Sequence, residues 1–80
     1  MSDTVIDARG LKCPLPVLKL EKVLAGTSAG ESIAVLANDP VARIDIPLYC
    51  QLQGHGLEMH DEKTFIRFVV TKVPDPESAG

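Results

Sequence analysis

The chain lacks tryptophan and has only three aromatic residues, two phenylalanines and one tyrosine, among its 80. We therefore expect an aliphatic core and no exposed row of aromatic rings on which nucleic-acid bases could stack. A basic excess is also missing, since the net charge is −3 and the isoelectric point is near 5.2. Both absences argue against a nucleic-acid-binding protein.

No apolar run approaches the roughly 20 residues that a membrane-spanning helix needs. Residues 1–4 (MSDT) do not show the basic and then apolar regions of a secretion signal. With only two cysteines and no such signal, we expect a reducing compartment, the cytoplasm. The length suits one domain, which we place at residues 1–73, followed by a disordered tail at 74–80. The sequence contains no internal repeat.

Hydrophobic periodicity and turn residues predict six elements in the order β-α-β-α-β-β. The predicted strands are residues 4–8, 31–37, 57–60 and 64–72, and the predicted helices are 14–25 and 40–53. Strand–helix–strand crossovers favour parallel neighbours, while the last two strands form a hairpin. The predicted fold class is therefore α/β (α+β): a two-layer sandwich in which two helices cover one face of a four-stranded mixed sheet.

Each predicted helix has an apolar periodicity. In the first, at about 100° per residue, one arc of roughly 120° forms the predicted core face; it contains Pro16, Val17, Leu20, Val23 and Leu24. In the second, apolar residues recur at spacings of three and four: Val41, Ile44, Leu48 and Leu52. Asp39 is the predicted N-cap of this helix and Pro40 its first residue, and Pro47 is expected to kink or break it near Asp45-Ile46.

The stretch GLKCPLP, residues 10–16, places a cysteine directly before two prolines. Pro14 suits the first helical position, and a proline pushes the preceding residue out of helical conformation, so Cys13 is the predicted N-cap. Its sulfur would face the free amides of Leu15 and Val17 at the positive end of the helix dipole. We predict that Gly10, Pro14 and Pro16 position the thiol.

The helix dipole alone lowers a thiol pKa by only roughly 0.2–0.7. A free thiol with a pKa near 8.5 is about 7% ionised at pH 7.4. Lys12 and Arg9 are therefore the predicted thiolate-stabilising residues, and we expect a modestly lowered pKa for Cys13. The alternative, that Cys13 is a buried small apolar residue at a helix start, stays open on spacing alone.

On the first helix, four side chains are predicted to point away from the core, namely Leu15, Leu18, Lys19 and Lys22. Two leucines beside the thiol, followed by two lysines, favour a docking surface for a partner protein with an acidic rim. The alternative is two ordinary surface leucines.

Cys50 is interpreted as a small apolar residue of the second helix. A resolving thiol for Cys13 is an alternative, although the two cysteines form no Cys-x-x-Cys motif. A zinc site of Cys13, Cys50, His55 and His60 is a further one. The cysteines are unpaired in sequence, however, and the histidines flank a glycine and lie near a turn, so we expect no metal.

Residues 7–16 (DARGLKCPLP) resemble the signature of the TusA/SirA/YedF sulfur-carrier family, which is marked by Cys-Pro-x-Pro at the start of the first helix. The resemblance continues through Asp39-Pro40, residues 45–47 and Cys50, and covers nearly everything from Val5 to Lys72. It implies a cytoplasmic protein with a two-layer sandwich fold. The family's cysteine, here Cys13, accepts sulfane sulfur as a persulfide and relays it to a partner protein, so the protein acts as a carrier in a persulfide relay rather than as an enzyme with multi-substrate turnover. The implied partners are a sulfur-donor protein (a cysteine desulfurase or rhodanese-like protein) and a sulfur-acceptor protein.

The resemblance implies no cofactor beyond the transient persulfide, no membrane contact and no direct nucleic-acid contact. Family members serve tRNA thiolation, molybdenum cofactor formation or dissimilatory sulfur metabolism, and some relatives are linked to selenium. Leu15 and Asn38 depart from the family pattern, which often has a charged residue and an aspartate there. We expect a monomer, with transient dimerisation left open. The alternative function is a non-catalytic protein-interaction or regulatory module.

Overall fold

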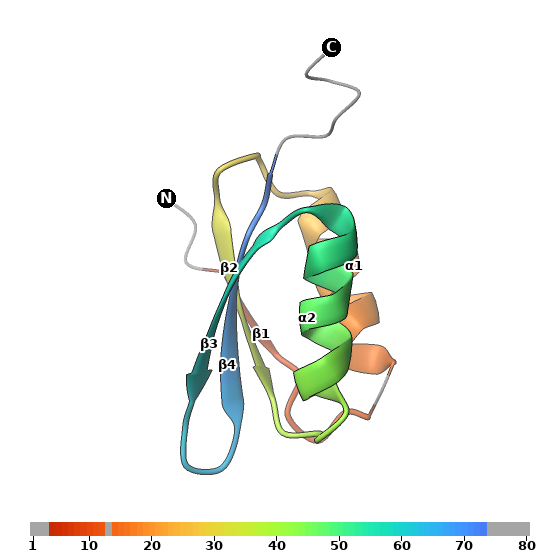
Figure 1. Ribbon diagram of the computed structural model, residues 1–80, viewed down its shortest axis with the longest axis vertical. Coiled ribbons are helices and arrows are strands. Elements are labelled where there is room, and N and C mark those ends of the chain that lie inside the picture. The colour runs from red at the N-terminus through yellow and green to blue at the C-terminus, as the bar shows by residue number, and fades with distance from the viewer. Residues whose placement is uncertain (1–3, 13, 74–80) are drawn as a thin grey trace.

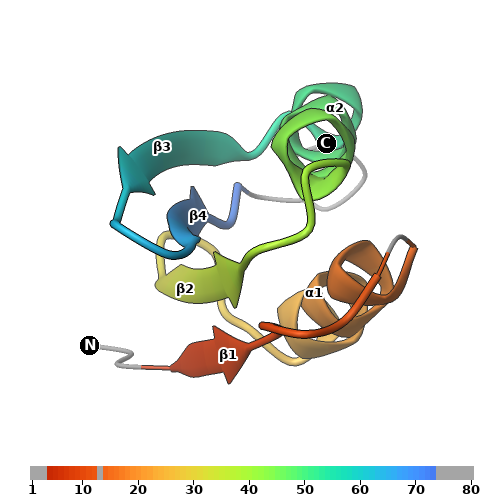
Figure 2. The same ribbon diagram turned by 90° about the horizontal axis from the view of Figure 1, so that it is seen from below.

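The computed structural model, which describes residues 4–12 and 14–73, confirms the predicted order of elements (Figure 1). The elements are β1 (Val5–Asp7), α1 (Leu15–Ala25), β2 (Ser32–Ala37), α2 (Ala42–Gln53), β3 (Gly56–Asp61) and β4 (Ile66–Thr71). β1 pairs with β2 in parallel, and β4 pairs antiparallel with both β2 and β3, so the strand order is β1-β2-β4-β3. Both helices cover the same face of this mixed sheet, as predicted (Figure 2).

The core lies between the sheet and the two helices. Alternate residues of the central strands face it: Ile33, Val35 and Ala37 on β2, and Ile66, Phe68 and Val70 on β4. Each helix buries three residues four apart: Pro16, Leu20 and Leu24 on α1, and Ala42, Ile46 and Cys50 on α2. The core is mainly aliphatic, as predicted, with Phe68 as its one aromatic residue among the buried positions described.

Helix α1 begins one residue later than predicted. Pro14 is its N-cap rather than its first residue, and the predicted N-cap, Cys13, lies outside the described residues. The physical reason is a tight turn in which the Leu15 amide donates to the Lys12 carbonyl at 2.8 Å, which places Pro14 in the turn. Pro16 is then the second helical residue, where an amide hydrogen would have no acceptor within the helix.

Helix α2 begins at Ala42, two residues later than predicted. The Asp39 carboxylate accepts a hydrogen bond from the Val41 amide at 3.1 Å, and the Asp39 carbonyl accepts one from the Ala42 amide at 3.0 Å. These bonds form a turn ahead of the helix and make Val41 its N-cap.

Helix α2 runs continuously from Ala42 to Gln53 through Pro47 (Figure 1). Of the predicted kink or break, the break is therefore wrong. A proline here removes one helical hydrogen bond, the one to the Arg43 carbonyl. On either side of it, Ile46 and Cys50 are buried against the sheet and hold the helix in place.

The apolar spacing correctly predicts a helix at α2, but the face that it defines is not the buried one. Four large aliphatic side chains on this helix are exposed: Val41, Ile44, Leu48 and Leu52. Neither described helix is long and apolar enough to cross a membrane. The predicted tail at 74–80 lies outside the described residues.

Candidate functional site

The loop between β1 and α1 is anchored to the loop that precedes α2. Gly10 has a φ of +84°, a conformation that favours glycine, although a Cβ there would meet nothing within 4 Å. Its amide donates to the Asn38 side-chain oxygen at 2.8 Å, and the Leu11 amide donates to the Ala8 carbonyl at 3.1 Å. These contacts fix the chain two residues before Cys13, which itself lies outside the described residues.

The Arg9 side chain contacts two neighbours, Asp7 and Phe65. Its Nε and Nη2 donate to the two carboxylate oxygens of Asp7, each at 2.8 Å, and its guanidinium lies over the Phe65 ring at 5.2 Å. Hydrogen bonds from Arg9 lower the pKa of Asp7 to about 2. The charge of Arg9 is therefore largely balanced by Asp7 rather than free to stabilise a thiolate.

Lys12 is exposed and, within residues 4–12 and 14–73, takes part in no ion pair. Of the two cations predicted beside the thiol, it is the one whose charge is not balanced by a described neighbour. The Leu15 amide, predicted to be free, donates to the Lys12 carbonyl, so this part of the prediction is wrong.

The outer face of α1 has the predicted composition. Leu15 and Leu18 are 46% and 50% exposed, and Lys19 and Lys22 are exposed beside them. None of the four ion pairs among the described residues involves these lysines. The structure therefore brings two leucines and two unbalanced lysines together on the solvent side of the helix that follows Cys13.

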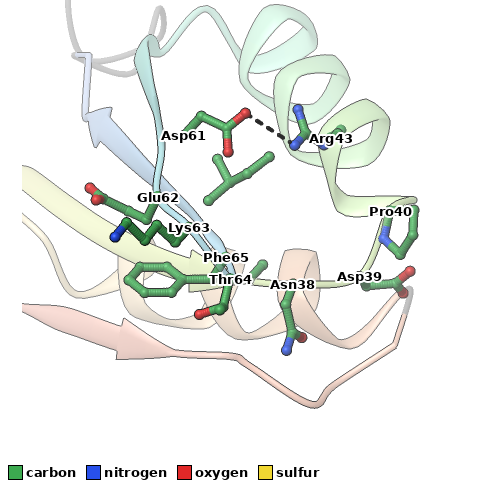
Figure 3. A pocket seen from close by; sticks show the side chains of 11 residues that line it. Asn38, Asp39, Pro40, Arg43, Asp61, Glu62, Lys63, Thr64 and Phe65 are labelled. Carbon is green, nitrogen blue, oxygen red and sulfur yellow. Dashed lines mark hydrogen bonds and ion pairs between the residues drawn. The ribbon is translucent and has the colours of Figure 1, made fainter.

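A pocket of about 260 Å³ lies between the β2–α2 loop and the β3–β4 hairpin (Figure 3). Across it, Arg43 of α2 forms an ion pair with Asp61 of β3 at 3.3 Å. Asn38 and Phe65 line the pocket and are the same two residues that hold Gly10 and Arg9. One wall of the pocket is therefore shared with the loop that carries Cys13.

Cys50 faces the core and is 1% exposed. Burial raises the pKa of its thiol to about 11. A thiol that is both inaccessible and protonated is a poor nucleophile, so Cys50 acts as the small apolar residue that its position predicts.

His60 lies on the other side of the sheet from Cys50, whereas the His55 backbone amide donates to the Cys50 carbonyl at 2.9 Å. His60 pairs with Arg67, whose side chain is on the open face of the sheet, whereas Cys50 lies on the helical side. The His55 ring nitrogen Nδ1 accepts a hydrogen bond from the Val73 amide at 3.2 Å. Among residues 4–12 and 14–73, no three His, Cys, Asp or Glu side chains are grouped so that they could hold a metal ion.

Two residues of this site have no predicted role in the sequence analysis. Asn38 holds Gly10 through its side chain, and Phe65 supports Arg9 from the hairpin. Both act across 28 or more residues of sequence, and no local pattern signals such a contact. The Asp7–Arg9 pair does have a local signal, because an aspartate side chain commonly accepts a hydrogen bond from the amide two residues on, as Asp7 does from Arg9 at 3.2 Å.

The fold and the site together define a small two-layer α/β protein with one buried thiol and a second cysteine on an anchored loop at a helix start. Residues 4–72 match the protein family described as Sulfurtransferase TusA. The chain belongs to this family.

Curated relatives agree with this assignment. The sulfur carrier protein TusA of Pseudomonas putida GB-1 is 40% identical over 72 residues, covering 88% of this chain and 90% of that protein. The sulfur carrier protein TusA of Pseudomonas savastanoi pv. phaseolicola is 41% identical over 75 residues, covering 91% and 88%. The crystal structure of a SirA-like protein from Desulfitobacterium hafniense superposes with a TM-score of 0.78 at 26% identity, covering 89% of this chain and 99% of that one.

Proposed function

We propose that this protein is a sulfur carrier that holds sulfane sulfur as a persulfide on Cys13. Two observations support the proposal. The relatives named above are sulfur carrier proteins that align over most of the chain, and the second thiol, Cys50, is buried with a raised pKa. Cys13 is thus the thiol left for exchange chemistry, on a loop that Asn38 anchors.

The proposed step is a thiolate exchange that needs no oxidant or metal. The Cys13 thiolate attacks the outer sulfur of a donor persulfide, one S–S bond forms, the donor's S–S bond breaks, and the donor thiolate leaves. An acceptor thiolate then attacks the outer sulfur on Cys13 and releases the Cys13 thiolate. Lys12, with its unbalanced charge, favours the anionic sulfur in both states.

The proposed partners are a donor, a cysteine desulfurase or rhodanese-like protein, and a sulfur-acceptor protein, all in the cytoplasm. Both would dock on the outer face of α1 (Leu15, Leu18, Lys19 and Lys22), where apolar side chains supply contact area and the lysines attract an acidic rim. A carrier must leave each partner, and a small contact of this kind suits transient binding.

Intact-mass spectrometry after incubation with a small-molecule persulfide tests the proposal. Wild type and Cys50→Ala should each gain one sulfur atom, while Cys13→Ser gains none. An equal gain in Cys13→Ser would contradict the assignment, and loss of the gain in Cys50→Ala would place the sulfur on Cys50 instead.

A further inference from the structure

The solvent side of α2 carries an apolar stripe, which we define as Val41, Ile44, Leu48 and Leu52. These side chains are 43%, 67%, 50% and 73% exposed, respectively. At 100° per residue, they lie opposite Ala42, Ile46 and Cys50, the residues that pack on the sheet. The core of this chain leaves the stripe uncovered. It exposes roughly 400 Å², within the range of the largest apolar patch on a typical soluble monomer, which is often functional.

The charge around this stripe differs from that on α1. Helix α2 contains one basic and one acidic residue, Arg43 and Asp45, and Arg43 is already paired with Asp61. The remaining polar side chains of α2 are uncharged, namely Tyr49, Gln51 and Gln53. The stripe therefore offers no net charge by which a strongly charged partner would recognise it, and it does not repel a copy of itself.

The stripe is also symmetric along the helix. Ile44 and Leu48 are centred on position 46, and Val41 and Leu52 are centred within one residue of the same point. A twofold axis across Ile46 would set Ile44 opposite Leu48 of a second, antiparallel helix, and Val41 opposite Leu52. Such a self-complementary patch is what a twofold interface requires.

We propose that two copies of this chain associate weakly through the apolar stripe, with their α2 helices antiparallel. The exposed area is about half of the roughly 800 Å² that each partner buries in a standard stable interface, so the dimer is transient. The monomer expected from the sequence is then the dilute form of the protein. This inference does not rest on sulfur transfer, because it uses no atom of Cys13.

Sedimentation equilibrium over about 10 µM to 2 mM, with Cys13→Ser to prevent disulfide formation, tests the association. The average mass should rise from 8.6 kDa towards twice that value. Ile44→Ser combined with Leu48→Ser should weaken association at least tenfold. Leu15→Ser combined with Leu18→Ser, the matched control on α1, should leave it unchanged.

Salt distinguishes this contact from a lysine-mediated one. Each copy has a net charge of −3, so higher salt screens the mutual repulsion and should strengthen the dimer. A monomer at 2 mM, or a dimer that survives Ile44→Ser with Leu48→Ser, would overturn the proposal.

Disulfide trapping tests the register. Ile44→Cys and Leu48→Cys, each prepared with Cys13→Ser, are mixed in equal amounts and oxidised. Antiparallel pairing predicts that mixed 44–48 disulfides exceed the about one half expected from random pairing. A predominance of 44–44 and 48–48 products would contradict the antiparallel arrangement.

Discussion

The two helices lie in one layer and bury the same pattern, three residues spaced by four, yet their outer faces differ. The outer face of α1 combines Leu15 and Leu18 with two unbalanced lysines. The outer face of α2 presents four aliphatic side chains on a helix without net charge. Packing on the sheet constrains only the inner face of each helix, so the outer faces are free to bind different partners.

The largest difference in stability is expected between substitutions of two isoleucines of α2. Ile46 is fully buried, whereas Ile44 is 67% exposed. Ile46→Ala should lower the free energy of unfolding by about 2–5 kcal/mol, because it removes buried contacts and leaves a cavity. Ile44→Ala should change it by less than about 0.5 kcal/mol. Urea denaturation of dilute protein measures both, and equal losses would show that the stripe belongs to the core.

The two thiols provide the next contrast. Burial raises the pKa of Cys50 to about 11, whereas the sequence predicts no increase for Cys13 above the ordinary thiol value near 8.5. On that prediction, ionisation alone favours Cys13 by roughly 300-fold at pH 7.4. Iodoacetamide should therefore label Cys13 at least that much faster in the folded protein, with the gap closing in urea. Similar labelling rates in the folded state would contradict the difference between the two sites.

The charge of α1 is expected to matter for docking but not for chemistry. Reversing Lys19 and Lys22 to Glu should raise the KM for the carrier about tenfold when a cysteine desulfurase donates the sulfur, since like charges then meet an acidic rim. Loading from a small-molecule persulfide should be unchanged. Lys63→Glu, on the hairpin, is the matched control for each single reversal, Lys19→Glu or Lys22→Glu, since all three change the net charge equally. An equal effect of Lys63→Glu would show that net charge, rather than the outer face of α1, sets the KM.

The smallest effect is expected for the ion pair between Asp7 and Arg9. Asp7 has a pKa of about 2 in the folded protein against an ordinary 3.8, because Arg9 hydrogen-bonds its ionised form. The pair's contribution to stability is therefore present above about pH 4 and is lost as the pH falls through about 2. Carbon-detected NMR titration should find the low pKa, and Arg9→Gln should return it towards 3.8. An unchanged value in Arg9→Gln would mean that another contact lowers it.

The fold was largely predictable because the local patterns agree with it. The strands alternate, and the arc of Pro16, Leu20 and Leu24 identified the buried face of α1. On α2 the larger aliphatic residues point outward, while two of the three buried residues, Ala42 and Cys50, are small enough to let the helix approach the sheet closely. Spacing alone does not reveal which of two such faces is inward.

The site was predictable only where its parts are adjacent in sequence. The Cys-Pro-x-Pro stretch and the composition of the outer face of α1 could be identified from neighbouring residues. The contacts of Gly10 with Asn38 and of Arg9 with Phe65 join distant segments. The carboxylate of Asp7 competes with the thiolate for Arg9, and this contact has a local signal because an aspartate commonly accepts from the amide two residues on.

The most direct test of the central claim is to locate the sulfur atom in the wild-type chain. The protein is incubated with a persulfide donor, its persulfides are blocked by alkylation, and its peptides are sequenced by mass spectrometry. We predict the additional sulfur on the peptide containing Cys13 and an unmodified thiol at Cys50. Finding the sulfur on Cys50, or on neither cysteine, would contradict the account.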